Sequence, residues 1–583
     1  MNDYTRTIEA RLKWFGVVII IVVVILFWKM YVLQILQNDK YLALAQGQQR
    51  FETTEMGQRG RIYVHDSPVD SKAYYPLAFD QKKFAVWVVP RQLKDKAATA
   101  KSLAEFLSLP EKDIFDKINN DKYYIPPIKH GLSLDESKTI KAKKFSGVLV
   151  VPEYSRYYPE GTLASQVLGF VNAEGQGMYG FEGKYNAEMQ GKEGNVKGEK
   201  DTLGRVISLL EQQDPQDGTS YVLTVDRSVQ YFVEKKLSEA ITKYQADSGT
   251  VIIMDIKSGG IIAMASSPTF DPNSYQDQAK ADANLFMNPA ISYTFEPGSI
   301  FKPIVMAAAI DDGLVTKDTS ETFGESIDVG GHTIHTAEGK AFGLETMTQV
   351  LENSDNVGMV WVAEKIGNEV LNNQLKKFGF YDKTGIDLEG EVTGRPAYPV
   401  KDWKDINRAT IAFGQGITAT PLQLLTAYAT IANSGKYIYP HLVDKIILPD
   451  GTEKNVPKQE GEQVISAATA KDVGEMLRSV VLNGTGKKAN VPGYKVGAKT
   501  GTAQIADPIN GGYLKNDSGL GIFVHTAAGF APIDDPQYAM LVKLDKPKTN
   551  RYAESTAVPL FGEISSFLLN YHYRIAPTEV IPK

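Results

Sequence analysis

The pattern of hydrophobic and polar positions opens with one long apolar run near the N-terminus. Residues 14–28 carry no charged side chain, and beyond Lys29 the apolar character continues to residue 36. Because about 20 apolar residues form a helix long enough to cross a bilayer, residues 14–36 predict a transmembrane anchor. Three basic residues within the segment 1–13 place this segment in the cytoplasm. A cleaved signal peptide is the disfavoured alternative, because the apolar run is longer than a signal sequence uses.

Between about residues 37 and 215, short strand-like runs alternate with short polar helices. The segment 84–89 predicts a strand, whereas 101–107 and 111–118 predict helices. A G-x-G-x-x-G match at residues 175–180 lacks the strand, helix and acidic residue that a dinucleotide site requires, so we interpret it as a glycine loop. No second apolar run of spanning length follows the first, so we expect this region and the rest of the chain outside the cytoplasm.

The pattern becomes more regular after about residue 219. Strands are predicted around Lys499 and at residues 221–226, 249–255, 260–265, 528–531 and 538–544. The runs 249–255 and 260–265 are joined by a Lys-Ser-Gly-Gly turn and predict a β-hairpin. Helices are predicted at residues 228–244 and, with Thr420 as N-cap, from Pro421 to about Ser434.

These patterns predict an α+β chain in four parts. Residues 1–13 form a cytoplasmic tail, and residues 14–36 form the transmembrane helix. Residues 37–215 form a mixed domain, which we call the pedestal. Residues 216–575 form a C-terminal domain in which helices flank an antiparallel sheet.

Composition argues against several classes of function. The net charge is only −6 and the basic residues are dispersed, so no nucleic-acid-binding surface is predicted. The chain has no cysteine, which excludes disulfides, thiolate catalysis and zinc–thiolate sites. His332 and His335 lie in a strand or loop without an acidic partner motif, so we predict no metal site.

The first chemical signal is the segment Ser299-Ile-Phe-Lys302. Pro297-Gly298 is a turn signal, and Pro303 suits the first turn of a helix, so Ser299 is predicted at a helix N-terminus. Residues three apart share a helix face, which places Lys302 beside the Ser299 hydroxyl. A serine nucleophile needs a neighbouring base, and a lysine can serve only if its pKa is lowered from about 10.4. Taken alone, S-x-x-K is more often an ordinary helix start with a solvated lysine.

Two later motifs change that balance. Ser354-Asp-Asn356 follows, and Lys499-Thr500-Gly501 comes last, continued by Thr502. S-x-x-K, S-D-N and K-T-G in this order form the serine-acylation set of penicillin-binding proteins and class A β-lactamases. A second K-T-G at residues 383–385 lies in a turn-rich acidic context, so we assign the function to Lys499, which lies in a predicted strand.

With these motifs, the chain resembles the class B penicillin-binding proteins, which are membrane-anchored peptidoglycan transpeptidases. Asn356 and Gly414-Gln-Gly416 are similar to the division (septal) type, since the elongation type tends to have aspartate at the position of Asn356. His65-Asp66 departs from the family's usual Asp-Arg-Asn-Gly. Further family boxes extend the resemblance over nearly the whole chain: Arg59-Gly-Arg-Ile62, Arg156-Tyr-Tyr-Pro159, Gly161, Ala164, Gly169-Phe170, Gly180-Phe-Glu182 and Leu223-Thr-Val-Asp226 with Gln230.

The resemblance implies acyl transfer without a cofactor or metal, from a stem peptide that ends in D-Ala-D-Ala. Ser299 would attack the penultimate carbonyl while Lys302 takes its proton. The backbone N–H groups of Ser299 and Thr502 would hold the oxyanion. An amine from a neighbouring stem peptide would then resolve the acyl-enzyme.

The same resemblance implies roles for the other motif residues. Ser354 would pass a proton towards the leaving D-alanine, and Asn356 would orient Lys302 and the substrate amide. Lys499 would raise the positive potential of the site. Substrate and oxyanion contacts would come from the segment Thr500-Gly501-Thr502, with the two threonines on the terminal carboxylate.

The resemblance also implies location and partners. The protein would be a single-pass protein of the bacterial cell membrane, inhibited by β-lactams, and would act beside a glycan polymerase of the SEDS family and other division proteins. Two alternatives stay open: a penicillin-hydrolysing or penicillin-sensing protein, which would not need the pedestal, and a non-catalytic division scaffold. The intact residues Ser299, Lys302 and Lys499 argue against the scaffold.

Overall fold

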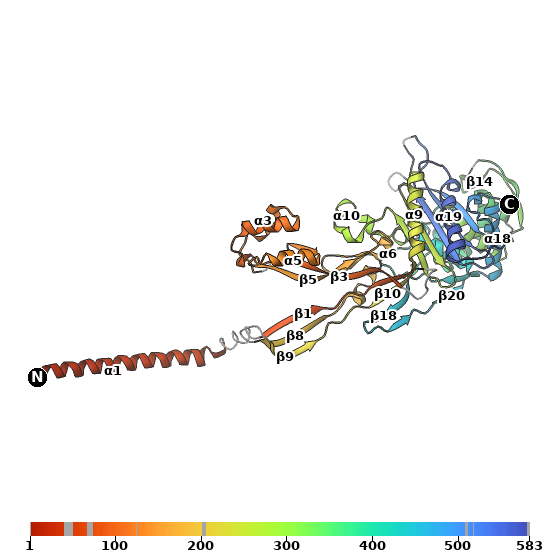
Figure 1. Cartoon of the computed structure of the whole chain (residues 1–583). Helices are drawn as coiled ribbons and strands as arrows, with labels where there is room; N and C mark the ends of the chain where they lie inside the picture. The colour runs from red at the N-terminus through yellow and green to blue at the C-terminus, as the bar shows by residue number, and fades with distance from the viewer. Residues whose placement is uncertain are drawn as a thin grey trace. The chain divides into compact units, whose positions relative to one another are not determined.

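The structure is a computed structural model that describes residues 2–39, 50–66, 74–123, 125–200, 206–337, 339–507, 511–516 and 518–579. The chain divides into two compact units (Figure 1). The first unit comprises residues 1–58 and 191–218, and the second comprises residues 59–190 and 219–583.

The first unit contains the apolar helix and a small sheet. Helix α1 (Asn2–Tyr31) continues into the π-helical turn η1 (Val32–Leu36). Residues 8–36 form a helix long and apolar enough to cross a membrane, which makes it a candidate anchor. The strands β1 (Arg50–Met56), β8 (Glu193–Lys200) and β9 (Val206–Gln213) form an antiparallel sheet in the order β1-β8-β9.

The second unit begins with a mixed sheet in the order β19-β18-β10-β2-β3-β4, with β5 paired to β3. Strand β10 pairs in parallel with β2 and antiparallel with β18. This sheet therefore joins strands from both sides of the predicted boundary between residues 215 and 216. Its strands are β2 (Ile62–His65), β3 (Tyr74–Val88), β4 (Lys129–Leu132), β5 (Val148–Tyr157), β10 (Ser220–Asp226), β18 (Val443–Ile447) and β19 (Glu453–Asn455).

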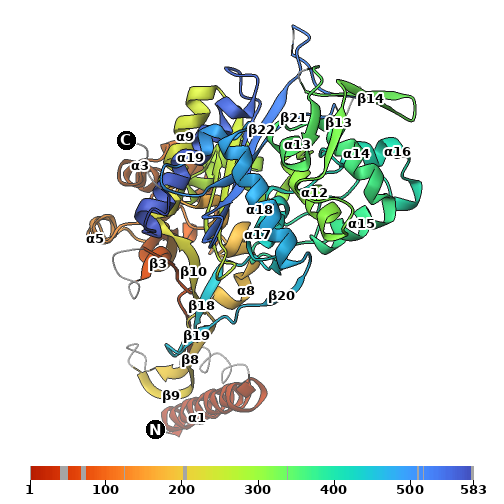
Figure 2. The same ribbon diagram turned by 90° about the vertical axis from the view of Figure 1, so that its right-hand side faces the viewer.

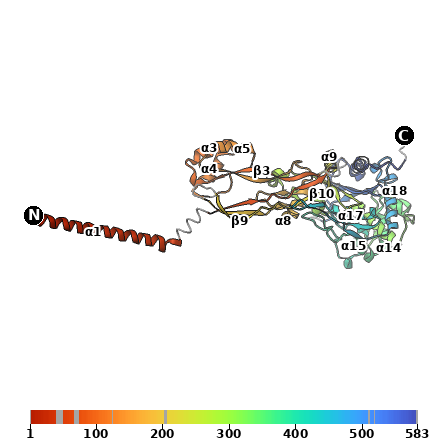
Figure 3. The same cartoon turned by 60° about the horizontal axis from the view of Figure 1, so that its bottom comes forward.

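Three helices pack against the long β3–β5 ladder (Figures 1 and 3). They are α3 (Lys96–Leu107), α4 (Glu111–Ile118) and α5 (Leu134–Ala142). Val86, Leu103 and Ile114 belong to the buried core between them. The strand at 84–89 and the two helices predicted here are confirmed, although α3 begins earlier than predicted because Asp95 caps it by accepting the N–H of Ala98.

A five-stranded antiparallel sheet organises the rest of the unit, in the order β12-β11-β23-β22-β21. Its strands are β11 (Ser248–Asp255), β12 (Ile261–Ser267), β21 (Gly497–Gln504), β22 (Phe523–Ala531) and β23 (Tyr538–Asp545). The predicted hairpin corresponds to β11 and β12. β21, which carries Lys499, is an edge strand of this sheet.

Helices cover both faces of this sheet (Figure 2). Because successive residues in a strand face opposite sides, Val251 packs with α9 (Arg227–Tyr244) and α19 (Ala557–Phe567), whereas Ile252 packs with α12 (Lys302–Asp311) and α17 (Pro421–Ala432). α18 (Ala467–Leu482) lies beside β21. Thr420 is the N-cap of α17, as predicted, and it forms a capping box with Gln423. The α+β class, with an antiparallel sheet flanked by helices, is confirmed.

Three sequence boxes of the pedestal meet in one buried ion cluster. Glu182 has no exposed side-chain surface, and its Oε2 accepts a hydrogen bond from Arg59 Nε at 2.7 Å. Its Oε1 accepts one from Arg156 Nε, also at 2.7 Å. Asp80 Oδ1 lies 3.3 Å from Arg156 Nη1 and completes the charge balance. The cluster ties the start of β2, the end of β5 and the helical turn α7 (Gly180–Lys184) together.

We expect Glu182→Gln to lower the thermal unfolding midpoint clearly, because removing one partner of a buried ion pair costs about 3–5 kcal/mol. Glu211→Gln is the control, since Glu211 pairs with Lys197 on the surface, where such pairs contribute about 0–1 kcal/mol. Scanning calorimetry of the two variants measures the difference. Equal midpoints for both variants would contradict the stabilising role of the cluster.

Candidate active site

Three separate elements bring the predicted motifs together. The short 3-10 turn η5 (Gly298–Phe301) carries Ser299, and α12 begins directly after it with Lys302. Ser354 lies in the turn between α13 (Met347–Glu352) and α14 (Asn356–Ile366). Strand β21 supplies Lys499. The predicted position of Ser299 at a helix N-terminus is thus observed, with the refinement that its own turn is 3-10.

Close packing surrounds the turn that carries Ser299. A Cβ atom on Gly501 would lie 2.3 Å from Thr526 Oγ1 on β22 and 3.0 Å from Ile300 Cγ2 in η5, so a larger residue at this position would push against both neighbours. On the other side, the buried Tyr428 hydroxyl donates to the Ile300 carbonyl at 2.7 Å. These contacts set the position of the serine relative to the strand.

Lys302 is fully buried and faces the Ser354 turn. Its Nζ donates to Ser354 O at 2.6 Å, to Asn356 Oδ1 at 2.8 Å and to Ser354 Oγ at 3.2 Å. Burial lowers the pKa of Lys302 from 10.5 to about 7, although the carboxylates of Asp355 and Glu345 act in the opposite direction. Close to neutral pH, this lysine can therefore act as a base.

Lys499 reaches the same serine from β21. Its Nζ donates to Ser354 Oγ at 2.9 Å and to the Thr500 carbonyl at 3.3 Å. Burial, with a further contribution from the charge of Lys302, holds the pKa of Lys499 well below its usual value. The hydroxyl of Ser354 thus bridges the two lysines, and this bridge is the geometric centre of the site.

The turn that carries Ser354 is strained, and hydrogen bonds of the next two residues hold it in place. Ser354 has φ of +54°, a left-handed conformation that a non-glycine residue adopts only where the surroundings enforce it. The buried Asp355 caps α14 by accepting the N–H groups of Val357 and Gly358, each at 2.9 Å. Asn356 Nδ2 donates to the His335 carbonyl at 3.0 Å. These hydrogen bonds fix the directions of Ser354 and Asn356.

A buried glutamate that the sequence reasoning missed lies next to this turn. Glu345, on β16 (Gly343–Thr346), accepts a hydrogen bond from Asn353 Nδ2 at 2.7 Å. Burial raises the pKa of Glu345 to about 7, and the negative charge of Asp355 adds to the shift. Glu345 carries no recognisable motif, because its position depends on the β-strand pairing of residues far from the S-D-N sequence.

Ser299 itself is partly exposed, as a nucleophile must be. Within the described part of the chain, its hydroxyl has no hydrogen-bond partner, because all three hydrogen bonds from Lys302 Nζ go to Ser354 and Asn356. Lys302 therefore makes no hydrogen bond to the Ser299 hydroxyl here. Such catalytic hydrogen bonds often tighten only when a substrate is bound.

The two threonines of β21 differ in their surroundings. Thr500 is buried, and its Oγ1 lies 2.9 Å from Thr485 Oγ1. Thr502 is half-buried, and its Oγ1 accepts the Ala553 N–H at 3.1 Å. Neither Thr485 nor Ala553 carries a sequence signal, because both reach the site through long-range packing.

Two other sequence signals lie outside this arrangement. In the second K-T-G, Lys383 is exposed, and Thr384 donates its N–H and hydroxyl to the Glu391 carboxylate, so the threonine of that copy is already paired. His332 and His335 lie on β15 (His332–His335). Among the described residues, no group of three histidine, cysteine or acidic side chains could hold a metal ion.

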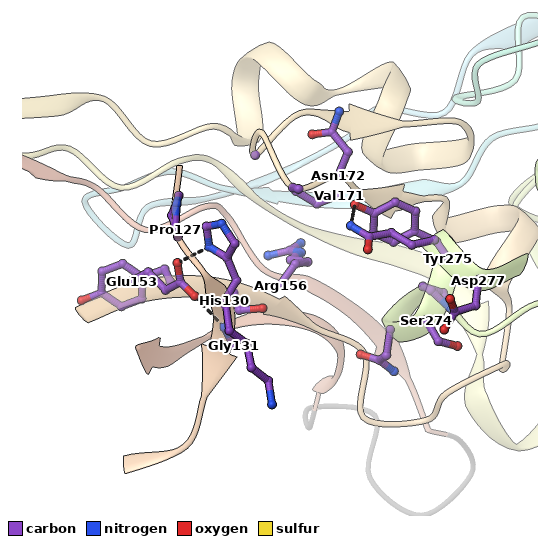
Figure 4. Close-up of a pocket in the computed structure, with 18 of the residues that line it drawn as sticks. Pro127, His130, Gly131, Glu153, Arg156, Val171, Asn172, Ser274, Tyr275 and Asp277 are labelled. Atoms are coloured by element: carbon purple, nitrogen blue, oxygen red, sulfur yellow. Dashed lines mark hydrogen bonds and ion pairs between the residues drawn. The ribbon is translucent and has the colours of Figure 1, made fainter. Parts of the chain in front are cut away.

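A cleft of about 640 Å³ lies away from these motifs, between the β4–β5 region and residues 272–277 (Figure 4). His130 contacts Glu153 there at 2.7 Å, and Arg156 at its wall is bound by Glu182. None of Ser299, Lys302, Ser354 or Lys499 lines this cleft. We therefore place the candidate active site at the Ser354 bridge and not in this cleft.

Comparisons with known proteins agree on one family. The family model of the penicillin-binding protein transpeptidase domain matches residues 249–566, and that of the penicillin-binding protein dimerisation domain matches residues 54–223. Stage V sporulation protein D of Bacillus subtilis is 34% identical over 568 residues, covering 96% of this chain and 85% of that protein. Peptidoglycan D,D-transpeptidase FtsI of Escherichia coli K12 is 32% identical over 503 residues, covering 85% and 81%.

Solved structures give the same result for the fold. Penicillin-binding protein 3 of Mycobacterium tuberculosis complexed with aztreonam superposes with a TM-score of 0.69 and 28% sequence identity. The match covers 91% of this chain and all of that one. A peptidoglycan synthetase from Bifidobacterium adolescentis gives a TM-score of 0.72 and 27% identity, covering 92% and 98%.

The pKa of Lys302 predicts how the reactivity of Ser299 depends on pH. Because Lys302 accepts a proton only when neutral, we expect the rate of Ser299 acylation by a β-lactam to rise from pH 5 and to level off above about 7. The titration should be absent in Lys302→Met, which should also be slow at every pH. Stopped-flow acylation rates between pH 5 and 9 measure this profile.

Glu345 titrates in the same pH range as Lys302, so its contribution to the pH profile must be distinguished from that of Lys302. In Glu345→Gln, the acid limb should persist and move to lower pH, because the variant lacks a negative charge that raises the pKa of Lys302. A profile that becomes flat in Glu345→Gln would assign the titration to the glutamate and contradict the role of Lys302.

Proposed function

The chain belongs to the class B penicillin-binding proteins, and from this premise we propose that it is a peptidoglycan D,D-transpeptidase that cross-links stem peptides through an acyl-enzyme on Ser299 during septal wall synthesis. The observation that carries the proposal is the bridge at Ser354, whose hydroxyl accepts hydrogen bonds from both Lys302 and Lys499. One hydroxyl between two buried lysines provides a proton path beside the nucleophile.

The first half-reaction is acylation of the serine. Ser299 Oγ attacks the carbonyl carbon of the penultimate D-alanine, and its proton passes to neutral Lys302. The oxyanion accepts hydrogen bonds from the backbone N–H groups of Ser299 and Thr502; loss of one such donor typically costs about 3–4 kcal/mol in other enzymes. The peptide C–N bond then breaks, and the terminal D-alanine leaves as an amine.

The leaving amine needs a proton, and the hydrogen bonds of the site suggest its route. Ser354 Oγ contacts Lys302 Nζ, which holds the proton, and can pass it towards the amine while receiving one in return. Asn356 keeps Lys302 directed at this hydroxyl through its Oδ1. In the second half-reaction, the amine of an acceptor stem peptide attacks the ester carbonyl, forms the new amide and releases Ser299.

Recognition of the donor rests on its terminal carboxylate. Lys499 raises the positive potential at the Ser354 bridge, and the hydroxyls of Thr500 and Thr502 are the proposed ligands of the carboxylate, with Gly501 keeping the strand close to η5. A β-lactam carries a carboxylate and a strained amide, so it enters the same site and acylates Ser299. The reaction uses no cofactor or metal.

We expect Ser299→Ala to abolish covalent labelling by a fluorescent penicillin while the thermal unfolding midpoint stays within the experimental error of the parent. The physical reason is that only the hydroxyl is removed, from a partly exposed position. The control is Ser292→Ala, because Ser292 donates to Gly390 O outside the site, and it should label like the parent.

The lifetime of the penicilloyl adduct distinguishes a transpeptidase from a penicillin-hydrolysing protein. A long-lived penicilloyl adduct on the parent fits a transpeptidase, whereas rapid turnover of penicillin would identify a penicillin-hydrolysing protein. A stable adduct on Ser299→Ala would show that the nucleophile is assigned to the wrong residue.

The remaining chain segments have the following proposed roles. Residues 1–13 are a cytoplasmic tail, residues 14–36 a single membrane anchor, residues 37–215 the dimerisation-type pedestal and residues 216–575 the transpeptidase domain. The helix at residues 8–36, which is long and apolar enough to span a membrane, and the three basic residues before residue 14 support the topology, with catalysis on the outer side of the bacterial cell membrane.

The proposed partner is a glycan polymerase of the SEDS family, working with other division proteins. Association of helices in lipid depends on close packing and polar contacts, and small residues favour it. Between residues 14 and 36 the chain has only Gly16 as a small residue, so the anchor alone should bind weakly. The pedestal should therefore contribute most of the affinity.

We expect replacement of the pedestal by an unrelated rigid domain, with the anchor kept, to lower co-purification of the polymerase strongly. A chain with the pedestal kept and the apolar segment 14–36 replaced by a polyleucine helix is the control and should retain most of the complex. If the pedestal swap leaves the complex undiminished, the pedestal is only a spacer.

A further inference from the structure

A backbone turn from another part of the chain holds the hydroxyl of Thr502. The Ala553 N–H donates to Thr502 Oγ1 at 3.1 Å, and Ala553 opens the 3-10 turn η8 (Ala553–Ser555), which precedes α19. A hydroxyl has one hydrogen and two lone pairs. The N–H occupies a lone pair and repels the hydroxyl hydrogen, which therefore points away from the turn.

This hydrogen is available to a substrate. In the part of the chain that the structure describes, Thr502 Oγ1 accepts from Ala553 and donates to no group. Thr500 differs, because its buried hydroxyl already faces Thr485 Oγ1 at 2.9 Å. Of the two proposed carboxylate ligands, Thr502 is thus the one whose hydrogen-bond direction is set in advance.

His525 of the sheet contacts the residues on both sides of the turn η8. It lies on β22 directly opposite Thr502 in the strand register, so both side chains share one face, and it is 1% exposed. Its Nε2 lies 3.1 Å from the Arg551 carbonyl, and its Nδ1 lies 2.8 Å from Thr556 Oγ1. The ring therefore contacts the chain on both sides of Ala553.

The partners of His525 determine its tautomer. A carbonyl oxygen only accepts, so Nε2 carries the hydrogen and donates it to Arg551 O. Nδ1 is then the acceptor, and the Thr556 hydroxyl donates to it at 2.8 Å, in preference to the Ala553 carbonyl, which lies 3.5 Å from the same oxygen. Burial lowers the pKa of His525 to about 4, which keeps the ring neutral and this pattern intact at neutral pH.

We propose that His525 is a positioning residue for substrate recognition: by fastening residues 551–556, it holds the Ala553 N–H on Thr502 Oγ1 and so presents the Thr502 hydroxyl as a donor to the terminal carboxylate of the acyl donor. The inference rests on the proposed function, in which Thr502 binds that carboxylate. It assigns a role to three contacts outside the family motifs: those of Ala553, Thr556 and Arg551.

The network should act on specificity. A freely rotating hydroxyl can donate to a carboxylate or accept from the NH₂ of a carboxamide. When the Ala553 N–H directs the hydroxyl hydrogen to the substrate, the hydroxyl favours the carboxylate, because a hydrogen bond to a charged carboxylate is stronger than one to the neutral oxygen of a carboxamide. Loss of the His525 contacts should therefore weaken binding of an acyl donor that ends in a carboxylate and leave binding of a donor that ends in a carboxamide nearly unaffected.

The experiment compares two thioester acyl donors that differ only in a terminal carboxylate or carboxamide. Thr556→Val removes the hydroxyl that donates to His525 and keeps the side-chain shape, whereas Thr556→Ser keeps the hydroxyl. We expect Thr556→Val to raise the KM of the carboxylate donor about tenfold, since hydrogen bonds to charged groups are among the stronger ones, with kcat within about twofold. The carboxamide donor should change less than about twofold, and Thr556→Ser should behave like the parent.

The matched control lies in the same turn. Ser555 accepts from Lys488 Nζ and does not contact His525, so Ser555→Ala should leave both donors as in the parent. His525→Asn is a second, independent variant, because its shorter amide cannot reach both the Arg551 carbonyl and Thr556 Oγ1. It should reproduce the selective rise in KM and keeps the test valid if Thr556→Val does not fold.

Three results would overturn the inference. They are an equal loss on both donors, an unchanged KM in the variants that fold, and a parent enzyme that does not prefer the carboxylate. Failure of the proposed function has a different signature, because a parent that a fluorescent penicillin does not label at Ser299 fails before any donor is compared.

Discussion

Two buried lysines share one half-buried hydroxyl, and the arrangement of the site follows from this constraint. Lys302 and Lys499 have no exposed surface, and both reach Ser354 Oγ, at 3.2 and 2.9 Å. Burial disfavours the charged form of both side chains, so the pKa of each lysine falls, and the charge of Lys302 lowers the pKa of Lys499 further. The same burial that makes a lysine costly in a protein core thus supplies what the nucleophile requires: a Lys302 with a pKa of about 7, which can be neutral near pH 7.

Holding that arrangement requires a rigid support. Ser354 occupies a left-handed conformation, which costs of the order of 1–3 kcal/mol. The Asp355 cap, typical of caps that stabilise by about 0.5–2 kcal/mol, offsets part of this cost. On β21, the lack of a side chain at Gly501 leaves room for Ile300 of η5 to pack against the strand. The positions of the two lysines therefore depend on backbone contacts that the three motifs themselves only partly encode.

The difference between local sequence signals and long-range contacts explains what the sequence could predict. Local signals were sufficient for the β11–β12 hairpin, for the Thr420 cap and for the order of the three motifs, because hydrophobic periodicity and capping act within a few residues. They could not predict that β10 pairs with both β2 and β18, that Arg59 and Arg156 share Glu182, or that Ala553 binds Thr502. Those contacts join distant segments, and strand periodicity identifies strands without identifying their partners. The helix-face argument placed Lys302 beside Ser299 and gave no sign of its hydrogen bonds to the Ser354 turn, whereas the contact with Asn356 was implied by the family resemblance.

Glu345 gives the buried site a further property. Its pKa is raised to about 7 while that of Lys302 is lowered to about 7, so the two groups titrate in the same pH range. An ionised Glu345 raises the pKa of Lys302 and so favours its protonated form, which means that neutralising one group favours neutralising the other. Proton transfer from Ser299 to Lys302 creates a cation in the core, and an ionised Glu345 nearby stabilises that cation. The carboxyl group therefore makes Lys302 a stronger base at the moment it accepts the proton, without contacting the substrate.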